Sequence, residues 1–114
     1  MAFCHFERVH ILGQRYFLKH LSAHWWMLKL GIRRSNRQEN RGQVVRLVAV
    51  IPGYVFGWVP KGNTGGAGVL AIKPMAIPKD LEALLQNYSV ARGVIGRGPV
   101  LALLAASAFI VLNR

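Results

Sequence analysis

Hydrophobic residues recur at steps of three and four along residues 3–32, which is the spacing of one apolar face on an α-helix. Most basic residues of this stretch fall on the opposite side, so the pattern predicts an amphipathic N-terminal helix. A break at Gly13 is one alternative, because glycine costs a helix about 1 kcal/mol relative to alanine. The apolar face comprises Phe6, Val9, Gly13, Phe17, Leu21, Trp25, Leu28 and Ile32.

Residues 33–43 are polar apart from one glycine, which indicates a linker between two halves of the chain. The next stretch, residues 44–59, is rich in Val, Ile, Tyr, Phe and Trp, a composition typical of β-strands. The Pro52-Gly53 dipeptide within it predicts a turn. The expected strands cover residues 44–51, 54–59 and 69–72.

Two further helices are expected after a flexible glycine-rich loop at 61–68. Leucines at helical spacing predict one of them over 79–91, and a run of apolar residues predicts the other over 94–112. The uncharged part of that run, residues 98–112, would be about 22 Å long against a hydrocarbon core of about 30 Å. It therefore either spans a membrane, with help from the residues before it, or packs as a buried helix.

The fold class expected from these elements is α+β, dominated by helices. An amphipathic N-terminal helix leads through the linker to a short central β element, and an apolar helix ends the chain. The expected organisation is a basic helix at 1–32, a polar linker at 33–43, a small α+β body at 44–91 and the apolar or transmembrane helix at 94–112.

The charge changes this picture, because the 114 residues include 15 Lys and Arg against 4 Asp and Glu, for a net charge of +11. Disordered basic tails are poor in apolar residues, whereas 53% of this chain is hydrophobic. The combination favours a partner that is both negative and apolar, such as a bilayer with anionic head groups. The single cysteine, Cys4, excludes an internal disulfide framework.

The N-terminal segment has the pattern of a helix lying in the head-group plane of a membrane, with Trp and Phe at the interface. A cleaved mitochondrial targeting segment is a further interpretation of the same basic stretch. The interfacial aromatic residues are then Phe17, Trp25 and Trp26. The candidate contacts to a membrane surface or to phosphates are Arg8, Arg15, Lys19, Lys29, Arg33, Arg34, Arg37 and Arg41.

We therefore expect a small basic membrane-associated protein without catalytic activity, acting as an accessory or assembly component of a larger complex. The excess of Lys and Arg before the C-terminal helix predicts an organellar inner membrane or another intracellular membrane, with residues 1–93 on the cytosolic or matrix side. One alternative is a soluble nucleic-acid-binding protein of the ribosome-associated type. Another is the product of a recently arisen or overlapping reading frame without a defined activity.

The sequence offers little support for catalysis or for a cofactor. The four carboxylates show no spacing that would pair them on one face, so we expect neither an enzyme nor a small-molecule substrate. His20 and His24 are four residues apart on one helix face, a spacing that can chelate a metal. No third ligand lies near them in the predicted helix, so no metal site is predicted.

Overall fold

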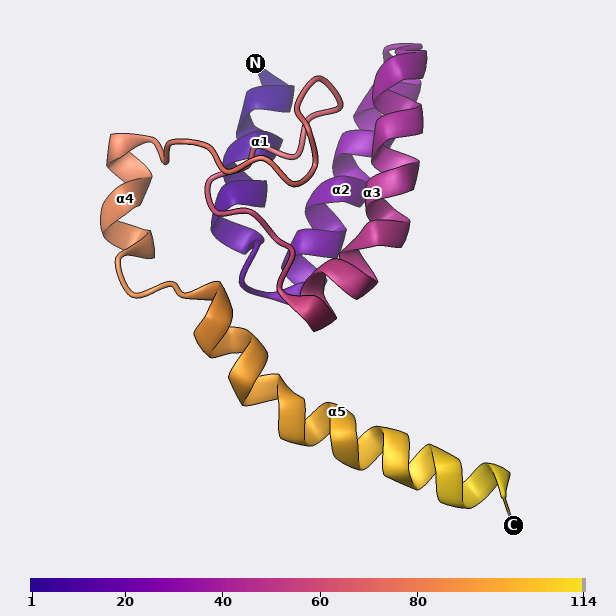
Figure 1. Cartoon of the computed structure of the whole chain (residues 1–114). Helices are drawn as coiled ribbons and strands as arrows, with labels where there is room; N and C mark the ends of the chain where they lie inside the picture. The colour runs from indigo at the N-terminus through magenta and orange to yellow at the C-terminus, as the bar shows by residue number, and fades with distance from the viewer. Residues whose placement is uncertain (114) are drawn as a thin grey trace.

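The computed structural model describes residues 1–113, and at Val90, Ala91, Gly93 and Gly96 it describes only the backbone. Within these residues the chain forms helices and no β-strand. The first three helices pack together, a long loop crosses α1, and the last helix projects away from them (Figure 1). The helices are α1 (Ala2–Gly13), α2 (Phe17–Arg33), α3 (Arg37–Phe56), α4 (Lys79–Leu85) and α5 (Val90–Leu112).

The prediction of an α+β fold is wrong, because the residues expected to form the first two strands lie in α3 as far as Phe56, and the expected strand at 69–72 lies in the loop that follows. The side chain of Asn36 caps this helix by accepting a hydrogen bond from the Glu39 backbone N–H at 3.0 Å. Gly57, with a φ of 72°, ends it. Pro52 lies inside the helix rather than at a turn. Packing of α3 against α2 outweighs the β-propensity of its valines and aromatic residues.

The single N-terminal helix predicted for residues 3–32 is instead a hairpin of two helices. The helix breaks just after Gly13, and residues 14–16 turn the chain into α2, which packs against α1. Gly13 lies close to Lys19, since a Cβ atom on this glycine would be 3.3 Å from the Lys19 Cβ. A glycine at this position therefore allows the close approach that the hairpin needs.

The helices expected near the C-terminus are present as α4 and α5, but the prediction of a transmembrane helix is wrong. Among the residues that the structure describes, no helix combines the length and the apolar character needed to cross a bilayer. The membrane orientation derived from that prediction loses its basis. Arg97 joins α5 to the helical body, because its guanidinium donates to the Tyr54 carbonyl oxygen and lies 3.5 Å from the centre of the Tyr54 ring.

The interior of the three-helix body contains many polar side chains beside its apolar ones, while many large apolar side chains lie on the surface. The amide side chains of Gln14, Gln43 and Asn63 are almost fully buried. By contrast, Trp25 and Trp26 are about half exposed. Because buried polar groups are costly unless they are hydrogen-bonded, this interior needs partners for each of them.

Candidate metal centre

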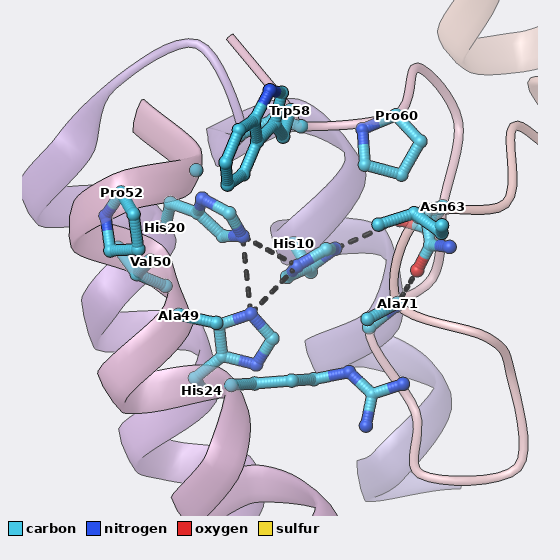
Figure 2. Close-up of a pocket in the computed structure, with 15 residues that line it drawn as sticks. His10, His20, His24, Ala49, Val50, Pro52, Trp58, Pro60, Asn63 and Ala71 are labelled. Carbon is cyan, nitrogen blue, oxygen red and sulfur yellow. Dashed lines mark hydrogen bonds between the residues drawn. The ribbon is translucent and has the colours of Figure 1, made fainter. Parts of the chain in front are cut away.

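Three histidines meet in the polar interior with their Nε2 atoms facing one another (Figure 2). The Nε2 atom of His10 lies 2.8 Å from that of His20 and 3.1 Å from that of His24. The Nε2 atoms of His20 and His24 are also 3.1 Å apart. All three residues are buried. The three nitrogens therefore form a nearly equilateral triangle inside the protein.

The α1–α2 hairpin creates this triangle. His20 and His24 are one helical turn apart on α2, so their side chains share the face that packs against α1. His10 lies on α1 at about the same number of residues from the turn as His20, on the other side of it. The hairpin thus brings His10 opposite the α2 pair.

The hydrogen-bond partner of His10 determines which of its nitrogens carries the hydrogen. Its Nδ1 lies 2.8 Å from the backbone carbonyl oxygen of Asn63, and a carbonyl oxygen can only accept. Nδ1 is therefore the donor, and in the neutral ring Nε2 presents a lone pair to the other two histidines. The Gln14 side chain donates to the same oxygen at 2.8 Å.

Hydrogen bonds that run through Gln43 show that Nδ1 also carries the hydrogen in His24. Gln43 donates through its Nε2 to the Glu39 carboxylate at 2.6 Å and to the Gly65 carbonyl oxygen at 2.8 Å. The reverse orientation of the amide would place its oxygen against two other oxygens. The Gln43 Oε1 atom therefore accepts from the His24 Nδ1–H at 2.7 Å, and His24 also presents a lone pair at Nε2.

His20 is the least constrained member of the cluster. Its Nδ1 is buried and has no hydrogen-bond partner among the described residues. Its Nε2 can donate one hydrogen, and that hydrogen can serve the lone pair of only one of the other two histidines. At most one hydrogen is thus shared by three nitrogens that all lie within hydrogen-bond distance, which leaves lone pairs facing each other.

Burial keeps the three rings neutral. Desolvation lowers the pKa of His20 to about 3 and that of His24 to about 4, from an ordinary value of 6.5. Desolvation, with the charges of the other two rings, lowers the pKa of His10 well below its ordinary value. A second proton therefore does not resolve the repulsion between the lone pairs near pH 7, whereas a metal ion accepts all of them at once.

The triangle matches the spacing of ligands on one metal ion. Three imidazole nitrogens at about 2.0–2.1 Å from a tetrahedral zinc ion lie about 3.3–3.4 Å apart. The observed separations are a few tenths of an ångström shorter, a difference that small rotations of the rings remove. Hydrogen bonds that orient two of the three rings through their other nitrogen are the arrangement found around metal-binding histidines.

A cavity of about 170 Å³ opens beside the three histidines. It holds a ligand of several non-hydrogen atoms, since one water molecule needs about 10–15 Å³ of such space. Two small residues of α3 at the cavity wall, the exposed Ala49 and the buried Gly53, leave this room, and Trp58 and Pro60 cover it (Figure 2). The side chain of Arg46 also lines the cavity. A metal ion bound here would have a fourth coordination position facing the cavity.

The glycine-rich segment 61–68, expected to be a flexible loop, is instead fastened over the site. The Asn63 side chain donates to the carbonyl oxygens of Leu70 and Lys73 and accepts from the Gly65 backbone N–H. Gly65 has a φ of 77°, and a Cβ atom there would lie 2.7 Å from the His10 ring. Glycine at this position therefore lets the loop backbone approach the His10 ring closely.

The basic residues that the sequence singled out lie on the outside of the helices and not at this site. Arg8 pairs with Asp80, and Lys29 lies over the rings of Trp25 and Trp26. Phe17 packs against Tyr54, with ring centres 5.2 Å apart. Arg15 and Lys19 are exposed near the α1–α2 turn. The turn between α2 and α3 brings a second group of exposed arginines together: Arg33, Arg34, Arg37 and Arg41.

The sequence interpretation missed His10 as a partner of the α2 histidines. In the single continuous helix that the sequence predicted, His10 would be about 21 Å from His24, so the two residues could not share a metal ion. The signal that could have found it is the break at Gly13, because a hairpin turning there places residues 10 and 20 side by side. The further partners Gln43 and Asn63 come from segments whose structure was predicted wrongly.

Comparison with curated proteins and with solved structures gave no match. A family model does match residues 1–85, which is more than half of the chain. The matched part contains α1–α4, the three histidines and the loop that covers them, whereas α5 lies outside it. On this match, the chain belongs to the family described as Protein of unknown function (DUF3703).

Proposed function

We propose that this protein binds one transition-metal ion, with zinc as the first candidate, through the Nε2 atoms of His10, His20 and His24. The observation that carries the proposal is the triangle of buried nitrogens 2.8–3.1 Å apart, at least two of which present lone pairs. Three imidazoles suit zinc, copper, iron and nickel rather than magnesium or calcium, which prefer oxygen ligands.

The surroundings support a site with an exchangeable ligand rather than a purely structural one. Structural zinc sites have four protein ligands, whereas sites with three protein ligands keep a position for water or another small molecule. Here the described residues supply three ligands, and a cavity adjoins them. The residues lining the cavity include no carboxylate that could take a proton, so binding is the function proposed, not a specific reaction.

Zinc titration of the full chain against a chromophoric chelator tests the proposal. We expect one zinc ion per chain, with binding weakened at least about a hundredfold in His10→Ala and His24→Ala, because each removes one of three ligands. His5→Ala is the matched control, since His5 is exposed on the same helix as His10. Equal zinc affinity in the parent chain and in His10→Ala would exclude this site.

We also retain association with an anionic surface as a second proposal, carried by different residues. The rings of Trp25 and Trp26 are about half exposed, and the Lys29 ammonium lies 5.7 Å and 4.6 Å from their centres. Half-exposed tryptophans beside a lysine are typical of the region between head groups and acyl chains. This proposal requires only attachment to a surface and no spanning helix.

A further inference from the structure

The cavity beside the three histidines combines a wall of apolar side chains with one buried cation. Arg46 is only 8% exposed, and it is one of the residues that line the cavity together with the histidines. Two of its nitrogens donate to the backbone carbonyl oxygens of Gly42 and Val69. Among the described residues, no carboxylate forms an ion pair with it within 4.0 Å. A buried charge in this situation favours a negative partner.

The charge balance of a loaded site points the same way. A divalent ion on three neutral imidazoles keeps its full double charge, and Arg46 adds one more positive charge nearby. Burial lowers the pKa of Arg46, and the nearby charge of Glu39 only partly opposes this shift. The Glu39 oxygens already accept hydrogen bonds from Gln43 and Ala67. One carboxylate offsets one of the three charges, so the site as a whole stays positive inside the protein.

We propose that the metal binds a small anion as its fourth ligand, held in the cavity with Arg46 as countercharge. This inference rests on the metal site proposed above and names the class of ligand that the site takes. The anion coordinates the metal through one atom and accepts a hydrogen bond from the Arg46 guanidinium. Linear or planar anions of three or four non-hydrogen atoms fit a cavity of about 170 Å³.

The test uses the full chain loaded with cobalt(II), whose visible absorption changes when its ligands change. The loaded protein is titrated with sodium azide at constant ionic strength, and we expect a saturable change in the cobalt bands. Failure of cobalt to bind at all contradicts the metal site itself. Cobalt binding without a saturable response to azide overturns the anion proposal alone.

Two arginine variants test the part played by Arg46. Arg46→Met is expected to keep cobalt affinity within about threefold of the parent and to bind azide at least about tenfold more weakly, because a charge-assisted hydrogen bond is lost. Arg41→Met is the matched control, since Arg41 is exposed on the same helix. Equal azide affinity in the two variants overturns the role of Arg46.

A third variant, Ala49→Phe, covers the case in which Arg46→Met does not fold. Ala49 lines the cavity and is also exposed, so a larger side chain there narrows the cavity with little disturbance of the core. We expect Ala49→Phe to bind cobalt but to lose most of the response to azide. Parent-like azide affinity in this variant contradicts the location proposed for the anion.

Discussion

The Nε2 atoms of His10 and His24 lie 3.1 Å apart, and the hydrogen bonds on the far side of each ring leave both of them without a hydrogen. The Nε2–H of His20 can satisfy only one of the two lone pairs. The metal-free protein therefore contains a repulsive contact that a bound cation removes. We therefore expect the proposed metal binding to be coupled to folding stability through this contact.

Zinc is expected to stabilise the folded chain. At a free zinc concentration of about 100 times the Kd, the free energy of unfolding rises by about 2.7 kcal/mol. Urea denaturation with and without zinc measures this difference, and addition of a chelator reverses it. In His24→Ala the same zinc concentration leaves the denaturation midpoint where it was. A shift of equal size in that variant contradicts binding at the three histidines.

Gln43 is expected to act as a positioning residue for His24. Gln43→Leu removes the oxygen that accepts the His24 Nδ1–H, so zinc affinity falls by about 10–100-fold while the three ligands remain. Gln38→Leu is the control, because Gln38 is exposed on the same helix. If Gln43→Leu lowers the denaturation midpoint but keeps the parent zinc affinity, Gln43 stabilises the fold without orienting the ligand.

A pair of glycines tests whether the covering loop shapes the site. Gly65→Ala places a Cβ atom within 2.8 Å of the His10 ring at a φ of 77°, so both the fold and zinc binding are expected to weaken. Gly68→Ala meets no atom within 4 Å and is expected to behave like the parent. Thermal denaturation and zinc titration of the two variants measure the contrast. If Gly65→Ala binds zinc with the affinity of the parent chain, the covering loop does not shape the metal site.

The metal-free protein is expected to lose stability as the pH falls from about 6.5 towards 4. Burial sets the pKa of His24 at about 4 in the folded state, below the 6.5 of the unfolded chain, so the unfolded state binds more protons in this range. For His24 alone the loss is about 2 kcal/mol at pH 5. Urea denaturation with a chelator at pH 7.5 and pH 5 measures it. A double variant, His20→Leu with His24→Leu, should show a flatter pH dependence than the parent.

Surface association is tested separately with vesicles. Arg15→Gln combined with Lys19→Gln is expected to weaken binding to anionic vesicles about thirtyfold at low salt and to change little on neutral ones, since each basic residue near the surface contributes about 1 kcal/mol. Both side chains are exposed, and neither is one of the three histidines proposed to bind the metal. Unchanged binding to anionic vesicles would remove the second proposal while leaving the first intact.

The sequence predicted the helices near the C-terminus better than the three-helix body, and the reason is physical. Apolar spacing grouped Phe6, Trp25 and Ile32 on one face of a single amphipathic helix, and in the structure Trp25 and Ile32 are exposed. The buried face of α2 carries His20 and His24, which hydrophobic patterns assign to the surface, together with Ala23, Met27 and Gly31. Hydrophobic periodicity does not identify buried polar residues, because the hydrogen-bond partner of each one is distant in the chain.

The sequence indicated only part of the candidate site. The spacing of His20 and His24 suits a metal ion, but no metal site was predicted because no third ligand was identified. His10 becomes a ligand through the hairpin, which depends on a close helix contact at Gly13 that no local pattern specifies. Gln43 and Asn63 reach the cluster from α3 and from the covering loop, so their role depends on tertiary packing that periodicity does not encode.

X-ray absorption spectroscopy of the zinc-loaded full chain tests the central claim most directly. The account predicts three imidazole nitrogens at about 2.0–2.1 Å and one further exchangeable oxygen or nitrogen ligand, with the multiple-scattering pattern of the histidine rings. The same measurement on His10→Ala should lose one imidazole. A zinc ion surrounded by oxygen atoms alone, or an unchanged imidazole count in His10→Ala, would contradict a metal centre at these three histidines.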